Sequence, residues 1–186
     1  MIVRKSALAE KYLNGLRGLE IGGGAHNSFG LNTLNVDYTD ELTEYKKMEI
    51  ETCGEALWVD IIANGDDLPF KDKTVDFVVS SHVIEHFFDP IKALLEWKRV
   101  AKKYILIVCP HKDRTFDKDK EVTPLQELID RHEGRIVNED PENHSHHSIW
   151  RTADFLELCN YLNLEVVDYL DVDSKVGNGF EVMIRL

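Results

Sequence analysis

The sequence predicts an α/β fold, a doubly wound and mostly parallel sheet of seven strands whose last strand is antiparallel. Short apolar runs alternate with segments of helical periodicity, which is the element order that a parallel sheet requires. Several runs are almost continuously apolar, as expected of strands covered on both faces. The last two runs flank Gly177-Asn178-Gly179, which predicts a chain reversal and hence an antiparallel hairpin.

Seven short apolar segments bounded by turn residues are predicted as strands. They are 17–21, 33–37, 56–62, 75–80, 104–110, 164–171 and 180–186. The segments 38–54 and 111–147 are predicted to be the irregular parts, apart from one helix in the second. Long loops at the carboxyl ends of parallel strands usually carry the substrate site, so we expect these two segments to approach it.

Four helices are predicted from start signals and periodicity. Asp89-Pro90 supplies an N-cap and a first-turn proline for a helix that should continue to about Lys102. Thr123-Pro124 repeats this signal, and Thr152 opens another apolar-periodic segment. Residues 6–15 form a short amphipathic pattern that should pack across one end of the sheet.

Length and composition indicate one globular domain over residues 1–186, with 43% hydrophobic and 30% charged residues. No apolar stretch approaches the roughly 20 residues needed to span a bilayer, so no membrane partner is predicted. The three cysteines are odd in number and widely separated, which is typical of reduced thiols in a cytosol rather than a disulfide framework. A cytoplasmic protein is expected.

The charge balance argues against nucleic acid as a partner. The net charge is −12, from 34 acidic and 22 basic residues, and such a surface repels phosphate backbones. The densest basic stretch, 98–103, lies at the end of a predicted helix, where the helix dipole accounts for it. A small-molecule substrate is therefore expected, while the sequence carries no signal for an oligomeric state.

A glycine cluster follows the first predicted strand. Glu20 precedes Gly22, Gly23 and Gly24, and Asp37 ends the second predicted strand. Glycines let the backbone approach a ligand closely, and a carboxylate can accept hydrogen bonds from both ribose hydroxyls. The pattern predicts a nucleoside site at the carboxyl edge of the sheet, although a plain glycine-rich turn is the alternative reading.

The spacing after the glycines disfavours a dinucleotide. A dinucleotide fingerprint needs G-x-G-x-x-G at the start of a full helix, but Asn27 occupies the third glycine position. Only residues 25–33 precede the next apolar run, which leaves room for a turn or two of helix. S-adenosylmethionine carries no phosphate, and its cationic sulfonium would be attracted by an acid such as Glu20.

Four motifs follow one another along the first half of the chain. They are Glu20-x-Gly22-x-Gly24, Asp37, Asp67-Leu68-Pro69-Phe70, and the run from Val75-Asp76-Phe77 through Ser80 to Glu85-His86. In order and spacing, these motifs resemble the type 11 group of class I S-adenosylmethionine-dependent methyltransferases. The resemblance covers about residues 16–110 and implies a Rossmann-like methyltransferase fold, methyl transfer, and S-adenosyl-L-methionine as cofactor.

The resemblance implies that the glycine turn lines the methionine part of the cofactor and that Asp37 holds the ribose. Asn64 stands where the family often has an acid, and its side-chain oxygen can still accept from the adenine amino group. Ala101-Lys102-Lys103 replaces the family's glycine-containing turn, so that connection should be tighter. The implied cofactor contacts are Glu20, Gly22, Gly23, Gly24, Asp37, Tyr38, Asn64, Gly65, Asp66, Leu68, Ser80, Ser81 and His82.

The acceptor implied by this reading is a small molecule or a sugar-like metabolite. A hydroxyl acceptor would need proton removal, for which His82, Glu85, His86 and His111 are the candidates. The alternative is a module of the same fold that binds S-adenosylmethionine or another nucleoside without transferring a methyl group.

Two histidine patterns raise the question of a metal. His82-x-x-Glu85-His86 matches an inverted zinc-peptidase motif, which requires one continuous helix. A predicted strand runs straight into His82 and a new helix starts near Asp89, so the context argues against it. His144-Ser145-His146-His147 has ligand-like spacing, but a solvated loop or an active-site lid is favoured. If this loop folds over the cofactor, His146 or His147 would be able to act as a general base near neutral pH. No metal site is predicted.

Overall fold

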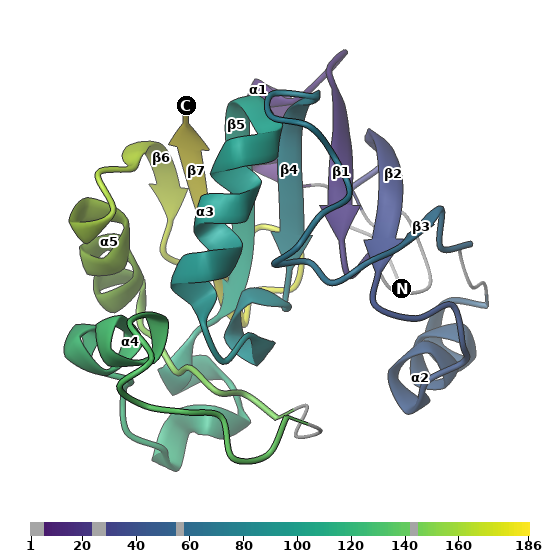
Figure 1. The fold of residues 1–186 in the computed structure, drawn as a ribbon. Coiled ribbons are helices and arrows are strands. Elements are labelled where there is room, and N and C mark those ends of the chain that lie inside the picture. Colours follow the sequence, from purple (N-terminus) through teal and green to yellow (C-terminus); the bar gives the residue numbers. More distant parts are fainter. Residues whose placement is uncertain (1–5, 24–28, 55–57, 142–144) are drawn as a thin grey trace.

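A seven-stranded sheet forms the centre of the computed structural model, which describes residues 6–23, 29–54, 58–141 and 145–186 (Figure 1). The strand order is β3-β2-β1-β4-β5-β7-β6, and β7 runs antiparallel to both of its neighbours while every other pair is parallel. The predicted fold class is confirmed. The strands are β1 Arg17–Ile21, β2 Asn32–Asp37, β3 Ile61–Ile62, β4 Val75–Ser81, β5 Ala101–Pro110, β6 Glu165–Leu170 and β7 Gly179–Arg185.

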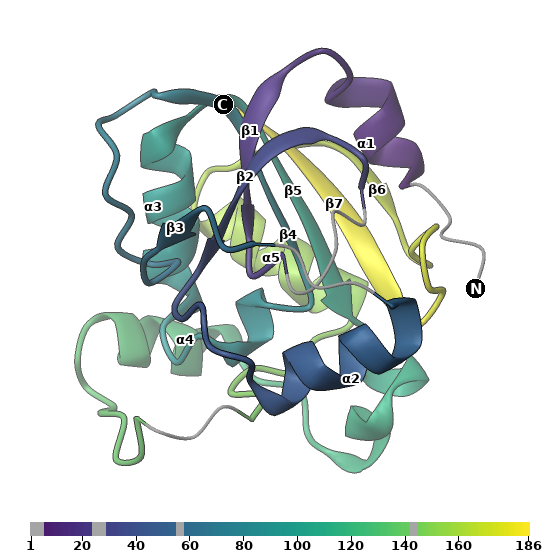
Figure 2. The ribbon, with the colours of Figure 1, turned by 90° about the vertical axis from the view of Figure 1, so that its right-hand side faces the viewer.

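Helices cover both faces of the sheet. Figures 1 and 2 show α3 and α1 on opposite sides of it. The α-helices are α1 Ala7–Tyr12, α2 Glu44–Cys53, α3 Pro90–Val100, α4 Leu125–His132 and α5 Thr152–Tyr161, and the 3-10 turns are η1 Ile84–His86, η2 Lys112–Arg114 and η3 Phe116–Asp119. Among the described residues, no helix combines the length and the apolar character needed to cross a bilayer.

The apolar core is divided by the sheet into two clusters. The larger lies against α3, α4 and α5 and includes the fully buried Trp97 and Phe155. The smaller lies against α1 and includes Leu13, Phe77 and Met183. Strands buried on both faces explain why their sequences are nearly continuous apolar runs.

The predicted helix start at Asp89 corresponds to an observed cap, whereas α4 begins at Leu125 without a side-chain cap. The Asp89 carboxylate accepts from the backbone N–H of Lys92 at 2.9 Å, and α3 begins at Pro90. The helix ends at Val100, so the predicted extension to Lys102 is wrong; Ala101 already belongs to β5. The connection between α3 and β5 is accordingly as tight as expected.

The predicted strand 56–62 is reduced to Ile61–Ile62 at the edge of the sheet, and residues 55–57 lie outside the described part. The reason lies in Asp60. Its carboxylate accepts from the backbone N–H of Asn35 at 2.7 Å, where a ladder partner would otherwise be needed. Regular pairing therefore begins only at Val36 and Ile61.

The segment 38–54 was predicted to be irregular, and this is wrong, because it contains α2. Thr43 caps the start by accepting from the backbone N–H of Lys46, and Gly54 ends the helix in a left-handed conformation with φ +83°. Both are ordinary start and stop signals. The weak apolar periodicity of this segment does not predict a helix: Met48 is exposed, and Lys46 contacts the sheet edge through a polar pair with Asp37.

Candidate functional site

The pairing register gathers the predicted site residues at the carboxyl edge of the sheet. Ile21 of β1 pairs with Val36 of β2 and with Ser80 of β4. The next residue on each strand is therefore Gly22, Asp37 or Ser81, so all three lie side by side one step beyond this row. In both views α2 lies beyond this same edge (Figures 1 and 2).

Gly22 makes the first turn of this edge. Its φ is +62°, and a Cβ there would lie 2.6 Å from Val83 Cγ2, so only glycine fits. The next residue, Gly23, donates its backbone N–H to Asn35 Oδ1 at 3.1 Å. Glu20 is buried, with its carboxylate 3.4 Å from Thr33 Oγ1. Gly24 lies outside the described residues.

Asp37 ends β2 and is held by α2. Its Oδ2 lies 3.3 Å from Lys46 Nζ, and both side chains are about nine-tenths shielded from solvent. Lys46 also donates to the backbone carbonyl of Thr39 at 2.5 Å. Tyr38, the next residue, is half exposed, and burial together with Asp37 raises its pKa. No motif or spacing in the sequence predicts the Lys46 contact, because it depends on the path of α2.

The segment after β3 follows at the same edge. Asn64 is exposed, and the adjacent Gly65 is buried, with its carbonyl accepting from Trp97 Nε1 at 2.8 Å. Asp66 lies 2.9 Å from Lys92 Nζ, and the Leu68 N–H donates to Glu96 at 2.7 Å. These contacts fix the segment to α3.

The end of β4 carries two buried polar atoms without a hydrogen-bond partner among the described residues, Ser80 Oγ and His82 Nε2. His82 adopts φ +56°, and its backbone N–H donates to Val108 at 2.8 Å. Burial lowers the pKa of His82 to about 4, so this imidazole is neutral at pH 7. Unpartnered buried polar groups are costly, and such groups concentrate where a ligand binds.

Beyond His82, a second group of titratable side chains forms. Glu85 Oε1 lies 3.8 Å from His86 Nε2 and 3.8 Å from His146 Nε2. The other ring nitrogen of His146, Nδ1, lies 2.6 Å from Asp117 Oδ2. We call Glu85, His86, His146 and Asp117 the acid–histidine cluster.

The environment of this cluster perturbs both acids. Glu85 is 1% exposed, and burial raises its pKa to about 8. Burial acts in the same direction on Asp117, but Lys120 and His146 outweigh it and hold the pKa of Asp117 below its ordinary value. The two acids of this cluster therefore differ in protonation at pH 7, as is common in functional sites.

Backbone contacts bring the second half of the cluster into position. The carbonyl of Glu85 accepts from the N–H groups of His147 and Ser148, at 2.8 and 3.2 Å. His146 is thereby held over η1, and its ring packs edge-on against His86 with the centroids 4.7 Å apart. The predicted loop or lid is thus fixed in the site at His146, while His144 lies outside the described residues.

His111 follows β5 and is also buried. Its Nδ1 accepts from the backbone N–H of Asp113 at 3.1 Å, and its ring packs edge-on against Phe180. Burial lowers the pKa of His111. One ring nitrogen of His111 is thus engaged by the backbone of the following turn, and its ring is packed against Phe180.

The inverted zinc-peptidase motif is not formed as a helical unit. His82 has left-handed backbone geometry, and only the single turn Ile84–His86 follows it, so the expectation against that motif is supported by the backbone. The partner that sequence reasoning missed is Asp117. No spacing pattern links it to His146, which lies 29 residues later.

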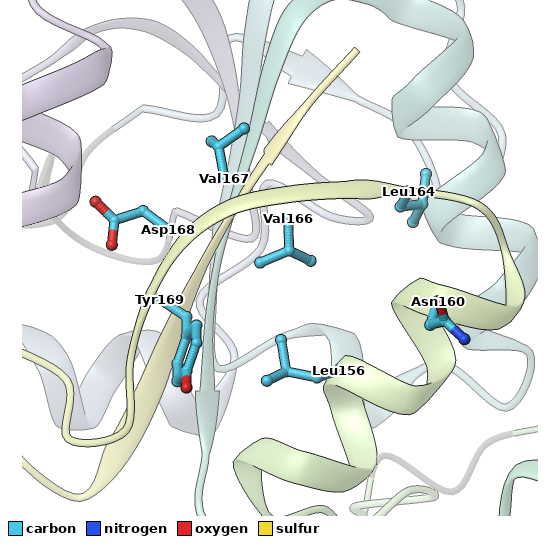
Figure 3. A pocket seen from close by; sticks show the side chains of 7 residues that line it. All are labelled: Leu156, Asn160, Leu164, Val166, Val167, Asp168 and Tyr169. Carbon is cyan, nitrogen blue, oxygen red and sulfur yellow. The ribbon is translucent and has the colours of Figure 1, made fainter.

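A depression of about 520 Å³ lies elsewhere, between α5 and β6 (Figure 3). Leu156, Val166 and Tyr169 are among its lining residues, and in the close-up Asp168 points away from Leu156. Asp168 bonds instead to Lys11 and Tyr12 of the α1 helix. None of the predicted site residues lines this depression.

The residues at the carboxyl edge fit an S-adenosyl nucleoside. Gly22 has no side chain, and a Cβ there would clash, so a ligand can approach its backbone closely. Asp37, on the neighbouring strand, offers a carboxylate. Ser80 Oγ and His82 Nε2 are buried polar atoms without a hydrogen-bond partner among the described residues, so a ligand can supply one. Lys46 already neutralises part of the Asp37 charge, which suits neutral ribose hydroxyls as partners.

Comparisons with known proteins agree with this geometry. Residues 19–109 match the family model described as a methyltransferase domain of type 11. A protein of Methanocaldococcus jannaschii described as uncharacterized is 37% identical over 91 residues, which cover 47% of this chain. The matched part spans 40% of the length of that relative.

Solved structures share the fold over nearly the whole chain. A SAM-dependent methyltransferase from Aquifex aeolicus superimposes with a TM-score of 0.54 at 21% identity, covering 96% of this chain and 86% of that one. One from Methanosarcina mazei gives a TM-score of 0.53 at 18% identity and covers 96% of both chains. At these identities the likeness concerns the fold. Together with the match over residues 19–109, it identifies a class I methyltransferase domain of the type 11-like group, for which S-adenosylmethionine is the cofactor.

Proposed function

We propose that this chain, acting as one domain over residues 1–186, transfers a methyl group to a small-molecule or sugar-like acceptor. The observation that carries the proposal is the register of β2, β1 and β4, which aligns Asp37, Gly22 and Ser81 at one edge. The net charge of −12 supports a small acceptor over a nucleic acid.

Each residue of this edge would bind a different part of the cofactor. Asp37 accepts hydrogen bonds from the ribose hydroxyls, and the Asn64 side-chain oxygen accepts one from the adenine amino group. Gly22 and its neighbours let the methionine part approach the backbone. When bound, S-adenosylmethionine supplies a methyl group on a positively charged sulfur. Ser80, Ser81 and His82 lie at the end of β4 and would orient that end of the ligand.

Proton removal from an acceptor hydroxyl would fall to the groups that follow β4. His82, with its pKa near 4, is a weak base, whereas Glu85, with its pKa raised to about 8, is a stronger one when ionised. We therefore favour Glu85 with His86 over His82, and keep His111 as the candidate from β5.

Calorimetric titration with S-adenosylmethionine and S-adenosylhomocysteine tests the cofactor site. We expect Asp37→Asn to weaken binding roughly 10- to 100-fold, because hydrogen bonds to a charged acceptor are worth about 1.5–3 kcal/mol each. The matched control is Asp40→Asn, an exposed acid three residues later, which should bind as the unaltered chain does. Equal affinity of the two variants would contradict the assignment of Asp37.

Turnover is tested separately. A panel of hydroxyl-bearing metabolites is incubated with the protein and S-adenosylmethionine, and formation of S-adenosylhomocysteine is measured. Binding without turnover on any member of the panel would favour the alternative, a non-catalytic binding module of the same fold.

A further inference from the structure

We propose that Glu85, His86 and His146 bind a divalent transition-metal ion such as Zn²⁺, contrary to the expectation from sequence. Their ligand atoms, one carboxylate oxygen and two imidazole nitrogens, all lie within 4.8 Å of one another. Two histidines and one glutamate are the protein ligands of many catalytic zinc sites, which keep a further position open.

The separations suit a site that closes around an ion. Bonds of 2.0–2.1 Å in tetrahedral geometry put ligand atoms about 3.3 Å apart. Glu85 Oε1 lies 3.8 Å from each imidazole Nε2 atom, so shifts on the order of half an ångström bring these pairs to bonding geometry. Rotation of the His86 side chain, the least buried of the three, would close the first pair, and a small shift of the Glu85 carboxylate would close the second.

The Glu85 carboxylate supports the proposal independently. It is 1% exposed, and neither of its oxygens has a hydrogen-bond partner among the described residues. Buried carboxylates are normally paired, hydrogen-bonded or bound to a metal. A cation between Glu85 and the two histidines supplies the missing partner.

Asp117 adds a feature that is common around metal-binding histidines. Its Oδ2 lies 2.6 Å from His146 Nδ1, which fixes the ring and directs Nε2 toward Glu85. A carboxylate on the outer nitrogen of a ligating histidine sets its tautomer and raises its basicity. His146 is 7% exposed in its side chain and Asp117 is 3% exposed, so water competes little for this contact.

Glu85 and His86 follow the end of β4, next to the proposed cofactor residues, so the ion would lie close to the methyl group. A role for the ion in catalysis rests on the proposed function. With Glu85 bound to the ion, and so not available as the base, an acceptor hydroxyl bound at the open position would release its proton to solvent. Its oxygen then bonds to the methyl carbon while the carbon–sulfur bond breaks, with the electron pair staying on sulfur. The products are a methyl ether and a neutral thioether. The ion would thus select acceptors that bear oxygen.

Metal content is the first test. Untagged protein is incubated with zinc chloride, dialysed against metal-free buffer, and analysed by mass spectrometry for metal per chain. We expect one ion per chain, and the visible absorption of the Co²⁺-loaded protein should indicate four or five ligands. Absence of retained metal would overturn the proposal.

Variants identify the ligands. His146→Ala should abolish retention, and Asp117→Asn should weaken Zn²⁺ affinity about 10- to 100-fold, the usual cost of losing an outer partner. The matched control is His132→Gln, which removes an imidazole on α4 that pairs with Asp89 outside the cluster. Retention by His146→Ala equal to that by His132→Gln would overturn the assignment.

Glu85→Gln separates metal binding from folding. Removing an unpartnered buried carboxylate should leave the metal-free protein as stable as before or more so, while stabilisation by added Zn²⁺ disappears. Zinc stabilising Glu85→Gln as much as the unaltered chain would contradict the proposal. Because these measurements need no acceptor, failed methyl transfer with retained zinc would refute the function and leave the metal site intact.

Discussion

Gly22 occupies a backbone conformation and a space that no other residue fits. Its φ is +62°, and a Cβ would lie 2.6 Å from Val83 Cγ2. We expect Gly22→Ala to lower the free energy of unfolding by about 2–4 kcal/mol, from the left-handed backbone and the clash together. Urea unfolding measures this, and calorimetry should show weakened binding of S-adenosylmethionine.

Gly30 is the matched control for Gly22. Its φ is +63°, but nothing lies within 4 Å of the Cβ position. Gly30→Ala therefore carries the backbone strain alone and should cost about 1 kcal/mol. If the two variants lose equal stability, the contact between the glycine turn and Val83 contributes nothing.

At the scale of elements, the reversal before β7 is organised by one carboxylate. Asp173 Oδ1 accepts from the backbone N–H groups of Lys175 and Val176, and Oδ2 accepts from those of Gly177 and Gly179. The hairpin predicted from the glycines is therefore held by an acid that precedes them.

These contacts make the stability of the hairpin depend on pH. Burial alone would raise the pKa of Asp173, but the N–H groups of Val176, Gly179 and Gly177 outweigh it and the pKa is lowered. The stabilisation is therefore present above the unfolded pKa of about 3.9 and is lost as the pH falls through the folded value.

Asp173→Asn should lower the free energy of unfolding at pH 7 by about 2 kcal/mol, because an amide NH₂ group replaces one acceptor. The deficit should shrink in acid below about pH 4, where the unaltered chain loses the same contribution. Urea unfolding at both pH values measures it, with the exposed Asp119→Asn as control. A deficit that is constant with pH would refute the role of the charge.

At the scale of the whole molecule, the reactivity of two buried cysteines indicates whether the larger apolar cluster unfolds as one unit. Cys109 of β5 and Cys159 of α5 are fully buried in the larger apolar cluster, and burial raises the pKa of both thiols, that of Cys159 to about 12. In a Cys53→Ser background, we expect both to react with a thiol reagent only through global unfolding.

Their labelling rates should consequently be equal and should rise with urea along the same slope. Mass spectrometry of peptides after timed labelling measures each site. Much faster reaction of Cys159 than of Cys109 would indicate that α5 opens separately from the sheet, and so would contradict a single cooperative core.

The sequence by itself determined most of the succession of strands and helices along the chain. It also determined the helix starts at Asp89 and Thr152, and the glycine turn and Asp37 at the ends of the first two strands. Each depends on local periodicity, capping or spacing, which neighbouring residues encode. The sequence did not predict that β3 is short, because the Asp60 side chain replaces backbone pairing there. It did not predict α2, because this helix lacks a strong apolar stripe and contacts the sheet edge through Lys46.

Only the tertiary structure decided that Lys46 neutralises Asp37 and that Asp117 and His146 complete a site with Glu85 and His86. These partners come from segments far apart in the chain. Their meeting depends on the paths of loops, and in particular on the backbone bonds from His147 and Ser148 to Glu85. Loop paths follow from packing and from backbone hydrogen bonds made across the fold, which no periodic pattern in one sequence records.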